Sequence, residues 1–221
     1  MTEKKKWFQE FLVKPYYYAR DDGVVLCGHA RSAMADFPDE SVSLIFTDPD
    51  YSKGSNLGYW TLAQKSPRIL IPGGVLITEV PHRYMTGIMM IFQLDGAAQG
   101  LLWRWLYAFL YLKGAQRRLR MGIRVIIKPM LCYVKGKWKN RGFVMDGFPV
   151  EPQPKVKHKW QKNLDGYKYF IERHTSPGDI VLDPFAGSGT TAFACRELGR
   201  RFVLIDCYHK VCADIAKELK S

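Results

Sequence analysis

Six short runs of apolar residues recur along the chain, each bounded by glycine or polar residues. They span residues 23–28, 43–48, 74–80, 124–135, 179–183 and 201–206. Continuous aliphatic runs without polar alternation are typical of parallel strands that are covered on both faces. Within the fourth run we expect Pro129 to break or bulge the strand, because proline cannot donate to the ladder.

Helical patterns lie between and after these runs. Residues 188–199 close at Gly199, residues 208–220 carry an apolar stripe at helical spacing, and residues 166–179 are expected to be helical up to Pro177. Residues 97–114 predict a further, largely apolar helix, and residues 50–59 and 136–157 look like loops. Alternation of strands and helices predicts an α/β fold with a doubly wound, mostly parallel, Rossmann-like sheet.

The charge is unevenly distributed in this chain of 221 residues, whose formal net charge is +12. Residues 82–162 contain 16 of the 33 Lys and Arg residues but only 3 of the 21 Asp and Glu residues. We therefore expect a single domain, 1–221, in which residues 82–157 form a basic insertion or a small recognition region. A basic segment with interleaved aromatic residues indicates a polyanionic partner, most often nucleic acid. The alternative is a solvated Lys/Arg face.

The five cysteines and the apolar stretches exclude several other classes. The cysteine number is odd and no C-x-x-C pair occurs, so neither a disulfide framework nor a metal site is expected. The N-terminus lacks the apolar core of a signal peptide, and residues 101–112 are too short to cross a bilayer and contain Arg104. We expect a cytoplasmic protein without a membrane partner.

The run DIVLDPFAGSGTTAFACRELGRRFVLID, residues 179–206, combines a strand, a glycine loop, a helix and a second strand. Glycines allow the backbone to approach a ligand closely, and an acid at the next strand's tip, Asp206, can hold both ribose hydroxyls. A pyrophosphate is disfavoured, because Ala192 stands where a dinucleotide fingerprint has its third glycine and Asp183 opens the loop with an acid. An adenosine ligand with a positively charged end fits better.

These motifs resemble the amino-group DNA methyltransferases, which methylate adenine N6 or cytosine N4 with S-adenosylmethionine. DPFAGSGTT, residues 183–191, is similar to their cofactor motif, and SLIFTDPDY, residues 43–51, is similar to their D-P-P-Y catalytic motif. The catalytic motif comes first, as in the permuted beta arrangement of the family. Residues 38–48, 68–80 and 158–164 also resemble family segments. The resemblance covers most of the chain outside residues 81–154 and implies a methyltransferase sheet carrying the basic insertion.

Site residues follow from this resemblance by position. It implies that Asp48 and the Pro49 carbonyl accept the two N–H bonds of the target amine, and that Tyr51 stacks on the flipped base. Asp206 is expected to bind the ribose. The expected cofactor-binding residues are Asp183, Phe185, Ala186, Gly187, Ser188, Gly189, Thr190, Asp206, Lys162 and His29. The expected nucleic-acid-binding residues are Arg117, Arg118, Arg120, Lys135, Lys137 and Lys139.

The chain departs from the family at Asp50, where the motif usually has a second proline, and at His29, where an acid is frequent. Adenine N6 is favoured over cytosine N4 because the catalytic motif begins with Asp. Alternatives stay open: the same chemistry on RNA, or a non-catalytic nucleic-acid-binding subunit of methyltransferase fold. DNA is the expected partner, with a homodimer or a partner subunit as further options. The insertion is small, so we expect a short or loose recognition sequence, a preference for single-stranded nucleic acid, or a partner chain.

Overall fold

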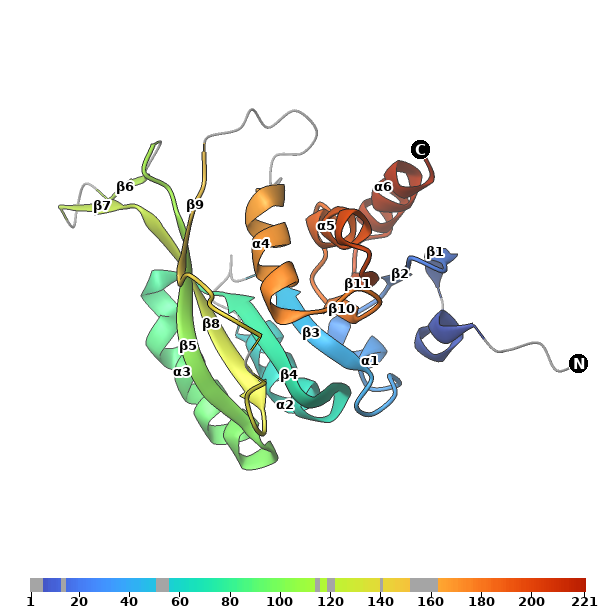
Figure 1. Ribbon diagram of the computed structural model, residues 1–221, viewed down its shortest axis with the longest axis horizontal. Helices are drawn as coiled ribbons and strands as arrows, with labels where there is room; N and C mark the ends of the chain where they lie inside the picture. Colours follow the sequence, from blue (N-terminus) through green and yellow to red (C-terminus); the bar gives the residue numbers. More distant parts are fainter. Residues whose placement is uncertain are drawn as a thin grey trace, which may run out of the picture.

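A nine-stranded sheet runs through the computed structural model and carries helices on both faces (Figure 1). The structure describes residues 6–12, 15–50, 56–113, 116–118, 122–139, 141–151 and 163–221, and for residues 116–118 it describes the backbone only. Arg120, Tyr51, Lys162 and the side chains of Arg117 and Arg118 therefore lie outside the described part of the chain.

The strand order of the main sheet is β1-β2-β11-β10-β3-β4-β8-β5-β9, and a separate hairpin is formed by β6 and β7. Strands β2, β11, β10, β3 and β4 are parallel, whereas β8 is antiparallel to both of its neighbours. The strands are β1 (Tyr16–Arg20), β2 (Gly23–Cys27), β3 (Val42–Thr47), β4 (Leu70–Glu79), β5 (Leu101–Leu110), β6 (Gln116–Arg118), β7 (Ile123–Val125), β8 (Ile127–Lys135), β9 (Gly147–Pro149), β10 (Ile180–Asp183) and β11 (Arg201–Asp206).

The helices divide between the two faces of the sheet (Figure 1). One apolar cluster joins α1, α2 and α3 to the sheet, and the other joins α4, α5 and α6 to the opposite face. The helices are α1 (Ala30–Ala33), α2 (Leu57–Ile69), α3 (Met85–Ile91), α4 (Leu164–His174), α5 (Thr190–Leu198) and α6 (His209–Lys220), with short 3-10 or π turns at Trp7–Phe11, His82–Tyr84, Phe92–Gly96 and Ala97–Gln99.

Burial of the central strands explains their apolar composition. All six residues of β3 are buried, and on β11 Phe202 and Leu204 enter one cluster while Val203 and Ile205 enter the other. A strand covered on both faces has no position at which a polar side chain would reach water. Five of the six predicted parallel strands are confirmed as β2, β3, β4, β10 and β11, whereas the fourth run forms β7 and β8, which are antiparallel to their neighbours. The predicted helices at α4, α5 and α6 are confirmed, and Gly199 ends α5 with φ 69° as predicted.

The predicted helix over residues 97–114 is wrong, because Leu101–Leu110 is strand β5, paired along its length with β8. Trp103, Trp105, Tyr107 and Phe109 alternate with the other residues at a period of two, and aromatic side chains favour strands. The run is apolar on every side, so its periodicity does not distinguish a helix from a strand. The strand pairing decides the outcome.

Two smaller expectations are also corrected. Pro129 does not break the fourth run, since it lies within β8 and its carbonyl accepts a 3.0 Å hydrogen bond from the Val80 N–H. Val80 is one residue past the end of β4, so the missing proline N–H affects only the end of this ladder. The run is interrupted at Ile126, between β7 and β8, and the expected loop at 50–59 ends earlier because α2 begins at Leu57.

The basic segment contributes to the sheet itself. Strands β8, β5 and β9 extend the sheet beyond β4, whereas the β6–β7 hairpin projects from it (Figure 1). A separate recognition region within residues 82–157 is therefore proposed only for the hairpin and the loops around it. None of the helices in the described part of the chain is long and apolar enough to cross a membrane.

The contact between α4 and β5 can be tested at Gly166. A Cβ atom at this position would lie 2.5 Å from Phe109 Cε1 and 3.2 Å from Phe148 Cδ1, so Gly166→Ala overpacks this interface. We expect a loss of about 1–3 kcal/mol in the free energy of unfolding, measured by denaturant titration. The matched control is Gly87→Ala on α3, where a Cβ atom would meet none of the described residues within 4 Å. It should be neutral or stabilising by up to about 1 kcal/mol. Equal stability of the two variants would contradict this packing.

Candidate functional site

The two sequence motifs meet where β10 lies next to β3. From β10 the chain continues through α5 to β11 on one side of the sheet centre, whereas β3 continues through α2 to β4 on the other. In open α/β sheets, ligands bind at such a point, outside the carboxyl ends of the strands. Asp48, Asp183 and Asp206 each stand at the carboxyl end of their strand, so this edge of the sheet brings the three acids together.

The Asp183 carboxylate links the two motifs through hydrogen bonds. Its Oδ1 accepts from the Thr47 hydroxyl at 2.6 Å and from the Phe185 N–H at 3.2 Å, and its Oδ2 accepts from the Thr191 hydroxyl at 2.7 Å. Thr47 directly precedes Asp48, and Thr191 lies in the first turn of α5. Asp183 therefore connects β3, the glycine loop and the helix that follows it.

Asp183 is only 4% exposed, so its contacts favour a supporting role beneath the loop over direct contact with a cationic ligand. Burial raises the pKa of Asp183 to about 6, against the lowering effect of the Thr47, Thr191 and Phe185 donors. Thr47 and Thr191 were not identified from the sequence. A hydroxyl before the catalytic acid and a hydroxyl after the glycines are the only local signals for them.

Asp206 holds the glycine loop from the neighbouring strand. Its Oδ2 accepts from the Gly187 N–H at 3.0 Å and its Oδ1 accepts from the Tyr208 N–H at 2.9 Å. Burial raises the pKa of Asp206, and the backbone donors of Tyr208, Gly187 and Cys207 act in the opposite direction. His29 is exposed and follows β2, the strand paired with β11, so it lies at the same edge as Asp206.

The rest of the glycine loop is shaped for close approach. Gly187 and Gly189 have φ values of 52° and 74°, which side-chain-bearing residues rarely adopt. Within the described part of the chain, a Cβ atom on Gly187 would meet nothing closer than 3.9 Å. The Ala186 N–H donates to the Ile205 carbonyl at 2.9 Å, which ties the loop to β11. The hydroxyls of Ser188 and Thr190 lie 3.1 Å apart. The loop thus offers open space above Gly187.

Gly58, at the start of α2, packs against both Pro49 and Phe185 of the glycine loop. A Cβ atom on Gly58 would lie 2.8 Å from Pro49 Cβ and 3.2 Å from Phe185 Cζ, so only glycine allows this approach without displacement. Sequence reasoning missed Gly58, which it assigned to a loop. Asp50 is exposed and follows directly, and Tyr51 lies outside the described residues.

Asp48 is held by a lysine that sequence reasoning did not assign. Lys128 Nζ lies 2.9 Å from Asp48 Oδ2 and also forms an ion pair with Glu79, at the end of β4. Glu79 in turn accepts a 2.8 Å hydrogen bond from the Tyr167 hydroxyl of α4. Two features of the sequence could have indicated this pair: Lys128 lies within an apolar run, and Glu79 is an acid at the end of another predicted strand. Their pairing is not visible in the sequence, because the two residues lie on different strands.

The predicted basic residues separate into two groups. Lys135 ends β8 at the amino end of β4, where it pairs with Glu40 at 3.0 Å and donates to the Leu70 carbonyl at 2.8 Å. The Lys139 side chain lies against Gly73, and Lys137 follows the same strand end. Lys135, Lys137 and Lys139 are therefore on the opposite edge of the sheet from Asp48, and their expected contact with nucleic acid stays a prediction.

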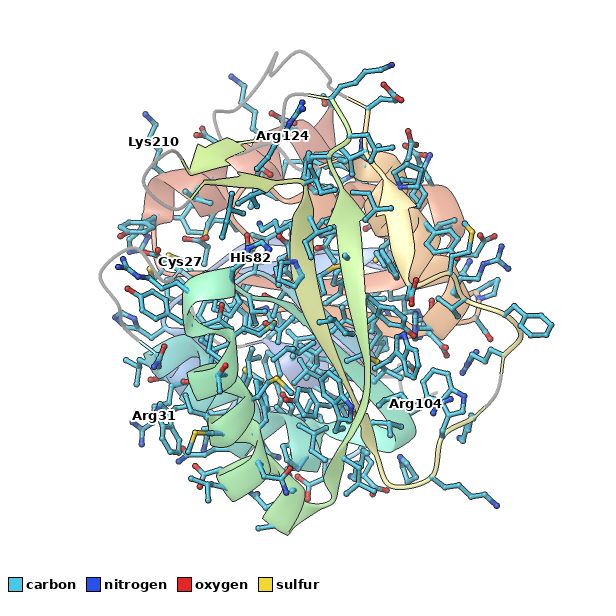
Figure 2. The ribbon with its side chains drawn as sticks, turned by 90° about the vertical axis from the view of Figure 1, so that its left-hand side faces the viewer. Cys27, Arg31, His82, Arg104, Arg124 and Lys210 are labelled. Carbon is cyan, nitrogen blue, oxygen red and sulfur yellow. The ribbon has the colours of Figure 1, made fainter. Side chains whose placement is uncertain are left out.

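The β6–β7 hairpin lies on the same edge as Asp48, because it leads directly into the start of β8 and Lys128. Arg124 is on this hairpin and is exposed (Figure 2). Arg104 lies instead near the start of β5, and its guanidinium is 4.7 Å from the Trp138 ring centroid. The strand β6 supplies the backbone of Arg117 and Arg118 to the same hairpin. The hairpin thus places Arg124 and the backbone of Arg117 and Arg118 on the same edge of the sheet as Asp48.

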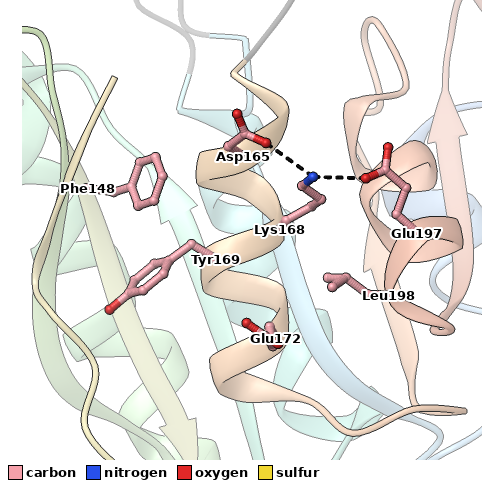
Figure 3. A pocket seen from close by; sticks show the side chains of 7 residues that line it. All are labelled: Phe148, Asp165, Lys168, Tyr169, Glu172, Glu197 and Leu198. Carbon is pink, nitrogen blue, oxygen red and sulfur yellow. Dashed lines mark hydrogen bonds and ion pairs between the residues drawn. The ribbon is translucent and has the colours of Figure 1, made fainter. Parts of the chain in front are cut away.

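A surface depression of about 400 Å³ lies elsewhere, between β9, α4 and α5. Figure 3 shows Lys168 bridging Asp165 and Glu197 in it, at 3.2 and 2.9 Å. Its lining includes no candidate site residue, and it is open to solvent. The carboxyl edge of the sheet is therefore the better candidate for catalysis.

Comparisons with known proteins agree with this geometry. Residues 113–218 match the family model N6_N4_Mtase, described as DNA methylase. The chain is 25% identical to Type II methyltransferase M.HpaI of Haemophilus parainfluenzae over 89% of this chain and 74% of that protein. The M1.HpyAVI–SAM complex is similar with 25% identity and a TM-score of 0.72, over 89% and 98% of the two chains. The cytosine-N4-specific PvuII DNA methyltransferase shares the fold, with 17% identity and a TM-score of 0.77 over 91% and 87%.

The raised pKa of Asp183 predicts a pH-dependent stability. Its folded-state pKa of about 6 exceeds the ordinary value of 3.8, so the stability from this group is fully present below about pH 4 and is lost as the pH rises through 6. The loss corresponds to about 3 kcal/mol in the free energy of unfolding. Asp183→Asn removes this titration, so parent stability should fall relative to the variant between about pH 4 and 7. Urea titrations across this range would refute the assignment if the difference stayed constant.

Proposed function

The chain belongs to the family of S-adenosylmethionine-dependent DNA amino-methyltransferases, and from this premise we propose that Asp48 and Pro49 hold the target amine during methyl transfer. The observation that carries the proposal is the adjacency of β3 and β10, which places the catalytic acid beside the glycine loop. The family matches the resemblance stated from the sequence, and the sheet matches the predicted fold class.

The residues at the carboxyl edge fit the cofactor. The positive φ of Gly187 and the open space above it leave room for a ligand, and the Asp206 carboxylate suits a pair of hydroxyls. S-adenosylmethionine, when bound, supplies a methyl group on a positively charged sulfur. We propose that Asp206 holds its ribose and that the loop from Phe185 to Thr190 lies against it. Asp183 supports this loop, and His29 and Lys162 stay proposed contacts.

The proposed role of Asp48 follows from the chemistry of the exocyclic amine that is methylated. The lone pair of an exocyclic amine is delocalised into the base ring, which makes the nitrogen a poor nucleophile. A carboxylate and a backbone carbonyl that accept its N–H bonds restore electron density to the nitrogen and fix its direction. Asp48 would accept one hydrogen and the Pro49 carbonyl the other, and Asp48 is the acceptor for the proton that the methylated nitrogen releases.

Adenine N6 is the proposed target, because the motif begins with Asp48. The comparisons include a cytosine-N4 enzyme at the level of fold, so the base is a finer proposal than the family. The target amine lies inside the base stack of duplex DNA, and the base must be flipped out to reach Asp48. We propose that Tyr51 stacks on the flipped base. Asp50 is proposed to loosen the loop without changing the chemistry.

The DNA contact is proposed at the β6–β7 hairpin. Arg124 is exposed there, and Arg117, Arg118 and Arg120 belong to the same segment. Phosphate contacts from such residues position a duplex without reading its sequence. The small size of this region supports a short recognition sequence. A second copy of the chain or a partner subunit would add contacts, and this stays a proposal.

Asp48→Ala should abolish methyl transfer, because the amine loses the acceptor that orients it. The measurement is transfer of labelled methyl groups from S-adenosylmethionine to unmethylated genomic DNA, with an RNA pool in parallel. Nuclease digestion of the product then separates N6-methyladenine from N4-methylcytosine. Cofactor affinity should stay within about threefold of the parent, since Asp48 is proposed to contact the target amine and not the cofactor. Transfer by the variant within about tenfold of the parent would remove Asp48 from the mechanism.

Asp206→Ala should weaken S-adenosylmethionine binding, measured by calorimetric titration. Each charge-assisted hydrogen bond lost contributes about 1.5–3 kcal/mol, so the dissociation constant should rise at least about tenfold. The matched control is Asp165→Ala, which removes an exposed carboxylate of α4 near the surface depression. The control should bind as the parent does. An unchanged dissociation constant for Asp206→Ala would show that another group holds the ribose.

A further inference from the structure

Four side chains from four elements form a cluster at the catalytic acid. They are Asp48 after β3, Glu79 at the end of β4, Lys128 near the start of β8 and Tyr167 on α4. Lys128 is in contact with both carboxylates: its Nζ is 2.9 Å from Asp48 Oδ2 and ion-paired with Glu79 Oε2. A single cation thus lies between two acids, of which one is the proposed amine acceptor.

Glu79 is the fixed end of this cluster. Its side chain is 0% exposed, its Oε1 accepts from the Tyr167 hydroxyl at 2.8 Å, and its Oε2 contacts Lys128. Its carbonyl accepts a further bond from the Tyr59 hydroxyl at 3.0 Å. A buried carboxylate without a cation is strongly unfavourable, so the charge of Glu79 holds the Lys128 ammonium in place.

The antiparallel direction of β8 explains how the lysine reaches the acid. Glu79 pairs with Met130, so Lys128 lies beyond the end of β4, on the same side of β8 as Met130. There its side chain passes Glu79 and reaches Asp48 on the next strand, β3. A parallel strand at this position would direct its carboxyl end, and not its start, toward the catalytic edge.

The charges of the cluster keep Asp48 useful as an acceptor. A lone lysine would cancel the negative charge that Asp48 presents to an amine on which positive charge develops. With Glu79 included, the formal charges of the two carboxylates and the ammonium sum to one negative charge. A carboxylate has about four acceptor positions, so Asp48 can hold Lys128 and an amine together.

We propose that Lys128 is a positioning residue for the reaction: it fixes the plane of the Asp48 carboxylate, and Glu79 anchors it and offsets its charge. This inference rests on the proposed function of Asp48. It assigns to Lys128 no contact with the base or the cofactor. Misplacement of a reacting group by about 1 Å can cost about 100-fold in rate, so a residue that acts only through Asp48 can have a large effect.

The test is single-turnover methyl transfer from tritiated S-adenosylmethionine to genomic DNA, with enzyme in excess. Lys128→Met should slow transfer by about 30- to 100-fold while the cofactor dissociation constant changes by less than about threefold. Lys128→Arg keeps the charge and should recover most of the rate. Glu79→Gln should slow transfer, and the double variant Lys128→Met/Glu79→Gln should be no slower than Lys128→Met alone, since Glu79 acts through Lys128.

The matched control is Lys168→Met, which removes a lysine that bridges two carboxylates outside the site and should leave the rate unchanged. If Lys128→Met fails to fold, the double variant replaces it, because it leaves no buried acid without its cation. Suppose that Asp48→Ala is inactive but the folded Lys128→Met variant transfers methyl groups within about threefold of the parent rate. That result overturns only the proposed role of Lys128 and leaves the proposed function in place. A parallel loss of cofactor affinity also overturns the role of Lys128, because the role would then be structural. Activity of Asp48→Ala would instead overturn the proposed function.

Discussion

The bond between the Thr47 hydroxyl and the Asp183 carboxylate, 2.6 Å long and buried, joins residues 136 positions apart in the chain. Both halves of the site depend on it. On one side it fixes the last residue of β3, directly before the catalytic acid. On the other, Asp183 holds the first turn of α5 through Thr191 and the loop through Phe185. Displacement of either strand along the other would separate Asp48, the proposed amine acceptor, from the glycine loop.

The burial of Asp183 has an energetic cost that fits this role. A carboxyl with three donors around it would ordinarily titrate at low pH, yet burial raises its pKa to about 6. Its desolvation therefore outweighs its hydrogen bonds. Strained or costly groups of this kind are typical of functional sites, where the gain is geometric. Here the buried Asp183 carboxyl connects the glycine loop rigidly to β3.

Local sequence patterns were sufficient to predict the strands of the parallel half of the sheet and the residues at which these strands end. Each buried strand is a continuous apolar run, so its carboxyl end and the acid that follows can be located from the sequence alone. Strand β5 could not be located from the sequence, since residues 101–110 are apolar or aromatic at nearly every position. Its strand conformation results from pairing with β8, and no local signal specifies that pairing.

The same limit explains the basic residues. Lys128 and Lys135 are seven residues apart on one strand, which at about 3.4 Å per residue separates them by about 24 Å. One therefore reaches the catalytic edge and the other the opposite edge, where it pairs with Glu40. Net charge along the sequence treats both alike. The assignment of Lys128 to the site requires the antiparallel register of β8, which is a property of the folded sheet.

The catalytic loop shows how packing can replace a missing proline. The family motif has a second proline where this chain has Asp50, and a proline there would restrict Pro49 to extended backbone. In this structure three other contacts constrain the loop: Thr47 bonds to Asp183, Lys128 pairs with Asp48, and Pro49 packs against Gly58 beside Phe185. Two of these involve side chains, and the third depends on a glycine of α2. Thr47, Asp48 and Pro49 are thus each held by a neighbour, and these contacts act on Asp48 without the backbone restriction that a second proline would supply.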